Sequence, residues 1–266
     1  MIPRIIHQTW KSRENLPTRF AHWRNSFIEL NPGFEAPIHD DADNRALLAR
    51  TFPQLLPVYD GFQREIFRVD FIRPVYMFTT GGTYADLDYQ CLRPLSLLDQ
   101  DGRAIILGRM GTDDHNAHSI PNAFMASAAN QGFWLGFLAK MLAAHHATRH
   151  VKGIEERPEY VTGPVVLRRA VHGYLREPDA FREQVLEFVR AHGLDIDPGA
   201  IAFGKLAVLP SHWLYPISWR DRIHTEFLGQ MNREDRLLSV AEARRYFPNS
   251  IAVTYWTYSW RMAPAS

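Results

Sequence analysis

The 266 residues carry 30 basic and 29 acidic side chains, and 46% of them are hydrophobic. A chain of this length and apolar content buries a core large enough for one generous α/β domain. Because the charges nearly cancel, no global field recruits nucleic acid or an anionic membrane, and a phosphate-bearing ligand must be held by a local site.

The first fifty residues alternate between strand and helix patterns. We expect a strand over 2–7, an amphipathic helix from about Pro17 to Leu30, a strand over 34–39, and a helix around 46–48 capped by Asp41 or Asp43. A strand–helix–strand–helix order is typical of a parallel α/β sheet.

A helix over about 62–79 comes next, with apolar residues at spacings of three and four. Pro74 should kink it or break its hydrogen-bond ladder locally. Gly81 and Gly82 then supply the positive φ angles of a sharp reversal, and an extended piece follows over 83–88.

The remaining elements are assigned from shorter patterns. They comprise strands over 104–108, 123–126, 206–209 and 251–255, and helices over 132–146, 165–174 and 179–192. No repeat or clear linker interrupts them. We therefore expect a single α/β domain over residues 1–266, with a mostly parallel central sheet and helical insertions.

The single cysteine, Cys91, cannot form an intramolecular disulfide and favours a reducing compartment. The N-terminus lacks a signal-peptide pattern, and no segment approaches the roughly 20 apolar residues that span a bilayer. We expect a cytoplasmic protein with at most peripheral membrane contact.

Asp86 and Asp88 are the first candidates for chemistry. Carboxylates at i and i+2 in extended backbone point to the same side, and such hard oxygen ligands suit Mg²⁺ or Mn²⁺. A dication held there would neutralise charge building on a leaving diphosphate. By itself an Asp-x-Asp pair is weak evidence, since most are solvated turns.

The surroundings of the pair are more specific. An apolar helix carrying Asp70-Phe71-Ile72-Arg73 is followed by Gly81-Gly82-Thr83-Tyr84-Ala85-Asp86-Leu87-Asp88. This order resembles the Asp-x-Asp sugar-binding region of glycosyltransferase family 32, which includes initiating α-1,6-mannosyltransferases and many bacterial polysaccharide enzymes. It also resembles the core of the large glucosylating toxins. The opening residues 2–10 and the segments 31–34 and 162–164 are similar to the family as well.

The resemblance implies a GT-A-like fold, a nucleotide-sugar donor and transfer with retention of configuration. It implies that Asp86 and Asp88 bind the metal, Mn²⁺ or Mg²⁺, and that Asp70 and Arg73 contact hydroxyls of the donor's sugar or ribose. It further implies donor-side roles for Gln8, Thr9, Trp10, Tyr84 and Asn122.

Simpler interpretations of these residues stay open. Asp70 and Arg73, at i and i+3, are compatible with a mere surface ion pair. Tyr84 and Trp10 are compatible with packed aromatic residues, and a histidine at a strand end, such as His7, is usually structural. Metal-capable groups also occur over 113–118, where the lack of periodicity predicts a loop.

The C-terminal segment departs from the family pattern. Where a histidine that completes the metal shell is expected, Thr254 and Tyr255 stand in this sequence, although the later Ser-Trp pair is present as Ser259 and Trp260. We expect these two residues on a mobile tail that closes over the diphosphate. Ser259 would then supply an oxygen ligand in place of the histidine.

The predicted function is metal-dependent transfer of one sugar from a GDP- or UDP-sugar to a glycan, glycolipid or protein acceptor. One alternative is a catalytically silent carbohydrate-binding or scaffold protein of the same fold, which the altered C-terminal segment favours. Another is a metal-dependent phosphohydrolase with Asp86 as nucleophile. In such enzymes the Asp-x-Asp pair follows a long apolar strand, and Gly81-Gly82-Thr83-Tyr84 is not such a strand.

Overall fold

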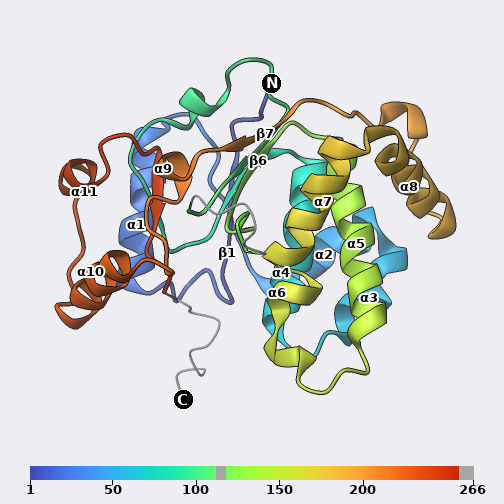
Figure 1. Cartoon of the computed structure of the whole chain (residues 1–266), viewed down its shortest axis with the longest axis horizontal. Helices are drawn as coiled ribbons and strands as arrows, with labels where there is room; N and C mark the ends of the chain where they lie inside the picture. The colour runs from blue at the N-terminus through green and yellow to red at the C-terminus, as the bar shows by residue number, and fades with distance from the viewer. Residues whose placement is uncertain (112–117, 258–266) are drawn as a thin grey trace.

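The computed structural model describes residues 1–111 and 118–257, without the side chain of Glu155. A six-stranded sheet crosses the middle of the molecule (Figure 1) in the order β2-β1-β3-β6-β5-β7. These strands are β2 (Ile38–His39), β1 (Ile6–Thr9), β3 (Gly82–Ala85), β6 (Phe124–Ser127), β5 (Ile105–Gly108) and β7 (Leu206–Leu209). Only β6 runs antiparallel to its neighbours, so the sheet is mostly parallel, as predicted.

Helices cover both faces of this sheet. In Figure 1, α1, α9, α10 and α11 lie on one side of it and α2 to α8 on the other. Their bounds are α1 Thr18–Leu30, α2 Asp41–Thr51, α3 Leu56–Gly61, α4 Glu65–Thr79, α5 Gly132–Thr148, α6 Pro158–Val161, α7 Pro164–Arg176, α8 Pro178–Ala191, α9 Ser211–Leu214, α10 Arg222–Arg233 and α11 Val240–Tyr246. Short 3₁₀ turns occupy Pro53–Leu55, Leu95–Leu98, Ile154–Glu156 and Pro198–Ala200. No helix in the described ranges is long and apolar enough to span a bilayer.

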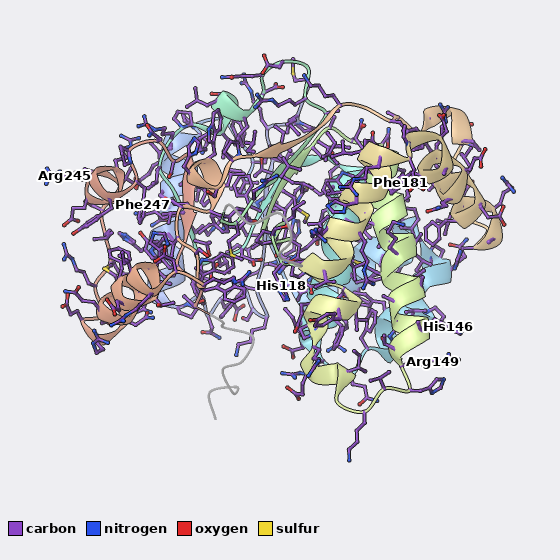
Figure 2. The ribbon with its side chains drawn as sticks, in the orientation of Figure 1. His118, His146, Arg149, Phe181, Arg245 and Phe247 are labelled. Carbon is purple, nitrogen blue, oxygen red and sulfur yellow. The ribbon has the colours of Figure 1, made fainter. Side chains whose placement is uncertain are left out.

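The core is divided between the two faces by the alternation of side chains along each strand. Tyr84 and Met125 pack into the cluster under α2 to α8, whereas their neighbours Ala85 and Phe124 pack into the cluster on the α1 side. Helical packing is close where glycine permits it. A Cβ at Gly136 of α5 would lie 2.2 Å from the ring of Phe181 in α8, which Figure 2 labels within this helical layer.

A second, two-stranded antiparallel sheet joins β4 (Tyr89–Cys91) to β8 (Ala252–Thr254). Tyr89 pairs with Thr254, so the end of the described chain lies directly beside the segment that follows the Asp-x-Asp pair. β4 and helices α10 and α11 were absent from the sequence prediction.

Several predicted boundaries need correction. β1 begins at Ile6 rather than residue 2, and β2 contains only two residues, because Pro3 and Pro37 cannot donate ladder hydrogen bonds. Asp40, not Asp41 or Asp43, caps α2, and Asp43 completes the capping box. The helix expected from about residue 62 begins at Glu65.

Pro74 does not break helix α4, which runs through it from Glu65 to Thr79. Its ring removes one backbone donor, the one that would reach the carbonyl of Asp70. Arg73 therefore stays in regular helical register with Asp70, one turn away on the same face.

Candidate active site

The reversal between α4 and β3 sets the position of the site. Gly81 and Gly82 adopt φ angles of 67° and 93°, in the region that L side chains rarely enter. A Cβ on Gly81 would lie 2.7 Å from the carbonyl oxygen of Ser127, and one on Gly82 would lie 2.6 Å from that of Ile5. The two glycines therefore let the reversal between α4 and β3 lie closer to the backbone of Ser127 and Ile5 than any other residue allows.

Arg73 stands between two carboxylates. One of its terminal nitrogens, Nη1, lies 3.1 Å from Oδ1 of Asp70, and the other, Nη2, lies 2.9 Å from Oδ1 of Asp86. The side chains of Asp70 and Arg73 are each only 6% exposed, which excludes the surface ion pair considered above. The structure thus brings three of the predicted site residues into one buried network.

Asp70 receives further hydrogen bonds from the second half of the chain. The amide nitrogen of Asn122 donates to Oδ1 at 2.9 Å, and the hydroxyl of Thr162 donates to Oδ2 at 3.1 Å. Arg73 also donates to the backbone carbonyl of Asn122 at 3.0 Å. Burial raises the pKa of Asp70 to about 6, although Arg73 and these hydrogen bonds act in the opposite direction.

Tyr84 is fully buried, and its hydroxyl joins the network. It donates to Oδ1 of Asp86 at 2.8 Å, so the hydroxyl of Thr9, at 3.0 Å, is the donor to Tyr84. The guanidinium carbon of Arg73 lies 4.8 Å from the centre of the Tyr84 ring. Tyr84 therefore belongs to the core and also holds Asp86 in place.

The backbone around Asp88 differs from the prediction. β3 ends at Ala85, and Leu87 and Asp88 form a turn closed by the Tyr89 amide, which donates to the Asp86 carbonyl at 3.1 Å. The extended backbone expected over 83–88 is therefore wrong, because the chain leaves the main sheet here to enter β4. The two carboxylates are still close together. Burial is the main cause that raises the pKa of Asp88 to about 6, and the negative charge of Asp86 raises it further.

This arrangement fits a divalent cation. The site contains three carboxylates, on Asp70, Asp86 and Asp88, and one guanidinium, on Arg73, so these four groups carry two negative charges in excess. Oδ2 of Asp86 has no donor among the described residues, and this carboxylate is 30% exposed. Within the same ranges no group of three or more His, Cys, Asp or Glu side chains could hold a metal, so water and substrate phosphates would complete the shell.

Two of the other predicted residues point away from the network. Gln8 faces α1, where its carbonyl oxygen accepts from Arg24 at 3.0 Å. The Trp10 ring packs edge-on against Phe20, and its indole N–H donates to the Asn15 carbonyl. A donor-side role for Gln8 and Trp10 stays a prediction. Ser259, Trp260 and the metal-capable groups of 113–117 lie outside the described residues.

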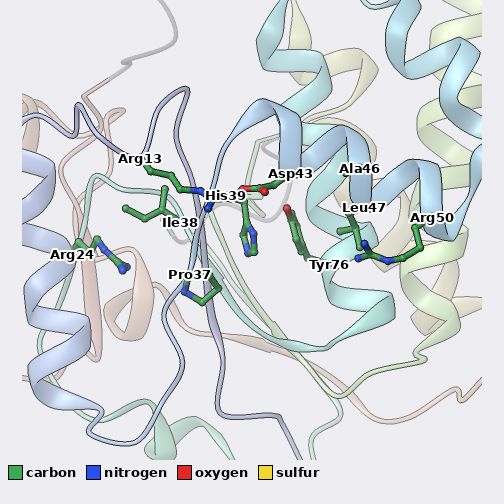
Figure 3. Close-up of a pocket in the computed structure, with 10 residues that line it drawn as sticks. All are labelled: Arg13, Arg24, Pro37, Ile38, His39, Asp43, Ala46, Leu47, Arg50 and Tyr76. Atoms are coloured by element: carbon green, nitrogen blue, oxygen red, sulfur yellow. Dashed lines mark hydrogen bonds and ion pairs between the residues drawn. The ribbon is translucent and has the colours of Figure 1, made fainter.

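A cavity of about 500 Å³ opens beside the network, at the edge strand β2. Figure 3 shows His39 and Tyr76 side by side in its wall, with Arg13, Arg24 and Arg50 around them. His39 pairs in register with Thr9, which places the cavity next to the Thr9 end of the network. None of the four charged network residues lines it, so we locate the chemistry at the carboxylates, where buried opposite charges meet.

Sequence reasoning did not predict the contacts that three threonines make with the acids. Thr162 binds Asp70, and Thr254 and Thr257 bind Asp88. Thr162 carried a weak signal, since it precedes the Gly-Pro that opens α7. Thr257 carried none, because a threonine near the end of a strand is common and its partner is 169 residues away.

Part of the chain is similar to known proteins. Residues 15–104 match the family described as "Glycosyltransferase sugar-binding region containing DXD motif". Inositol phosphoceramide mannosyltransferase 3 of Schizosaccharomyces pombe is 38% identical over 97 residues, which are 36% of this chain and 27% of that protein. Initiation-specific alpha-1,6-mannosyltransferase of Candida albicans is 26% identical over 99 residues, which are 35% of this chain and 26% of that protein. The matches thus span about a quarter of these relatives' length.

A solved structure shares the fold. The chain of the PaToxG glycosyltransferase superposes with a TM-score of 0.51, covering 75% of this chain and 82% of that one at 16% sequence identity. This confirms the α/β fold class predicted from the sequence. The predicted family resemblance is confirmed as well: residues 15–104, which contain Asp70, Arg73, Asp86 and Asp88, match the glycosyltransferase sugar-binding region with its DXD motif.

Proposed function

We propose that the protein is a glycosyltransferase that moves one sugar from a nucleotide-diphosphate sugar to an acceptor hydroxyl. The observation that carries the proposal is the position of Arg73. It joins Asp70 to Asp86 in a buried network, inside a region that matches sugar-binding glycosyltransferase sequences.

In the part of the chain that the structure describes, the network contains one hydrogen-bond donor without an acceptor. The buried Nε–H of Arg73 has no acceptor within the described residues. An unsatisfied buried donor costs about 1–3 kcal/mol, so a ligand oxygen that satisfies it gains affinity. A hydroxyl of the donor sugar supplies such an oxygen, and Asp70 beside it has one lone pair of Oδ2 left to accept from a second hydroxyl.

Asp86 and Asp88 would hold Mg²⁺ or Mn²⁺ with the donor diphosphate. When bound, the cation supplies Lewis-acid neutralisation of charge on the leaving diphosphate. The chain's own contribution is to fix the two acids. Tyr84 and Arg73 direct Oδ1 of Asp86 inward, which leaves Oδ2 available.

Retention of configuration is part of the proposal. Asp70 is a poor nucleophile here, since its side chain is only 6% exposed and both of its oxygens accept hydrogen bonds. A front-face displacement needs no protein nucleophile, only an oriented acceptor hydroxyl and a stabilised leaving group.

For the donor we propose a mannosyl nucleotide first, because the relatives cited above are named mannosyltransferases and match over the region that holds these acids. Their names also suggest a glycolipid or glycan acceptor. Because the match covers only about a quarter of those proteins, the acceptor is the less constrained part of the proposal.

The test is turnover of sugar nucleotides by the full chain. GDP-mannose, UDP-glucose, UDP-galactose and UDP-N-acetylglucosamine are incubated with Mn²⁺, and release of the nucleoside diphosphate is followed. We expect slow hydrolysis of one donor that stops with EDTA and in Asp86→Asn, and that persists in Asp60→Asn, a matched change at an exposed ion pair with Arg45.

Binding gives a second readout. A donor at about 100 times its dissociation constant should stabilise the fold by roughly 2.7 kcal/mol. Donor binding without turnover would favour the catalytically silent alternative, and neither binding nor turnover of any donor would contradict the proposal.

A further inference from the structure

The last described strand reaches Asp88 through the backbone. β8 pairs with β4, and beyond the ladder the amide of Tyr255 donates to the carbonyl of Asp88 at 3.0 Å. The segment that follows β8 therefore starts at a fixed distance from the second acid of the Asp-x-Asp pair.

Three donors from this segment converge on the Asp88 carboxylate. Thr257 donates its backbone N–H and its hydroxyl to Oδ2, at 2.9 and 3.1 Å, and the hydroxyl of Thr254 donates to Oδ1 at 3.4 Å. One carboxylate thus accepts from two threonines that follow it by 166 and 169 residues in the sequence.

A strained backbone conformation between these threonines directs Thr257 toward Asp88. Trp256 has a φ angle of 48°, a left-handed conformation that a bulky residue adopts only when its surroundings enforce it. Its amide donates to the Thr254 hydroxyl at 3.2 Å, and its indole N–H donates to the Ile217 carbonyl at 2.9 Å. The turn at Trp256 redirects the chain so that the amide of Thr257 faces Asp88.

The hydrogen bonds from the threonines leave the two oxygens of Asp88 with different numbers of free acceptor positions. A carboxylate offers about four lone-pair positions, two on each oxygen. Thr257 fills both positions of Oδ2, and Thr254 fills one position of Oδ1. A single position on Oδ1 is left for any further partner.

We propose that Thr254 and Thr257 are positioning residues that fix the Asp88 carboxylate so that Oδ1 is the oxygen presented to the cation. This inference rests on the proposed metal-dependent function. It gives Thr254 a role different from that of the expected histidine, since the hydroxyl contacts the acid. The proposed role of Thr254 and Thr257 does not depend on Ser259, whose role as a ligand stays a separate prediction.

The experiment measures Mn²⁺ binding to the full chain, by the loss of the free-ion electron paramagnetic resonance signal and by calorimetry, with no sugar nucleotide present. The variants are Thr257→Val, Thr254→Val, the double variant, and the serine substitution at each position. Thr148→Val is the matched control, because its hydroxyl donates to a helix carbonyl at the end of α5.

Removing partners that orient a metal ligand typically weakens metal affinity 10–100-fold. We expect each valine variant to weaken Mn²⁺ affinity about 10-fold, at the low end of this range, because the backbone N–H of Thr257 still donates to Asp88. The double variant loses both hydroxyls and should weaken the affinity further. Serine keeps the hydroxyl and should restore affinity to within about threefold of wild type, a rescue that mere packing would not give. Thr148→Val should bind as wild type does.

The outcomes separate the two proposals. If wild type binds Mn²⁺ and both valine variants bind it equally well, the positioning role is wrong and the proposed function stands. If affinity falls only as far as the folded fraction falls, measured by circular dichroism without metal, the threonines serve packing alone. If wild type binds no Mn²⁺, the metal-dependent function fails and this inference fails with it.

Discussion

Arg73→Lys tests whether one guanidinium holds the network together. Arginine reaches Asp70, Asp86 and the Asn122 carbonyl at once, at 3.1, 2.9 and 3.0 Å. Lysine keeps the charge, but an ammonium is a compact point charge and serves one of these acceptors well. The substitution therefore removes the geometry of the contact without removing its charge.

The expected loss follows from which contacts disappear. A hydrogen bond to a charged group contributes about 1.5–3 kcal/mol and one to a neutral carbonyl about 1 kcal/mol. Asp86 is 30% exposed, so water compensates part of its loss, whereas Asp70 is 6% exposed and receives little compensation. We expect Arg73→Lys to lower the free energy of unfolding by about 3 kcal/mol, or Tm by about 6–12 °C.

The assay is urea unfolding followed by circular dichroism, with Arg45→Lys as control. Arg45 bonds both oxygens of one aspartate, Asp60, at the surface, with side chains 55% and 43% exposed. Exposed pairs contribute little, so the control should lose no more than about 1 kcal/mol. Equal losses in the two variants would show that the buried network does not depend on the shape of the guanidinium.

Three further predictions concern the same region. Asp88→Ala should abolish transfer while the fold stays intact, as should EDTA, and a fully active variant in a turnover assay would contradict the metal-site proposal. Gly82→Ala should lower the free energy of unfolding by about 3 kcal/mol or more, and Gly102→Ala by about 1 kcal/mol, in the same unfolding assay. Both glycines have positive φ, but only at Gly82 would a Cβ meet a backbone oxygen, at 2.6 Å. Similar losses in the two variants would refute the close-contact argument. Burial raises the pKa of Asp70 to about 6, above its usual 3.8, so the folded state binds more protons between these values and the unfolding free energy of the metal-free protein should fall as pH rises through them. Asp70→Asn should reduce that fall in denaturant titrations at several pH values and leave the part that Asp88 contributes, since the pKa of Asp88 is also raised to about 6. An unchanged slope would show that Asp70 is not a source of it.

Local patterns were sufficient for most of the fold. The expected strand over 206–209 matches β7, and the expected helix from about Pro17 to Leu30 matches α1 within one residue. Elements were missed where the pattern is short or the partner is remote. β4 has only three residues, and its partner β8 lies about 160 residues later, so no local window contains the signal.

The candidate site was predictable to the extent that it is local. Asp70, Arg73 and Asp86 lie within 17 residues, and the helical spacing together with the family resemblance was enough to expect them together. The turn at Asp88 was not predictable from alternation, because the chain changes sheets there for reasons set by β8. Gln8 was expected beside the nucleotide, but alternation along β1 turns it toward Arg24 and turns Thr9 toward Tyr84.

The origin of the contacts suggests how such a site is tuned. The charged groups lie between residues 70 and 88, inside the region that matches glycosyltransferase sequences, whereas neutral donors to Asp70 and Asp88 come from Asn122, Thr162, Thr254 and Thr257, outside it. A neutral hydrogen bond changes the orientation and pKa of a carboxylate without changing the charge that faces a cation. Substitutions in the second half of the chain therefore adjust how the acids are presented and leave their chemistry in place. If the proposed function holds, a threonine where histidine was expected would alter the strength of metal binding, and the reaction itself would depend on the acids of the matched region.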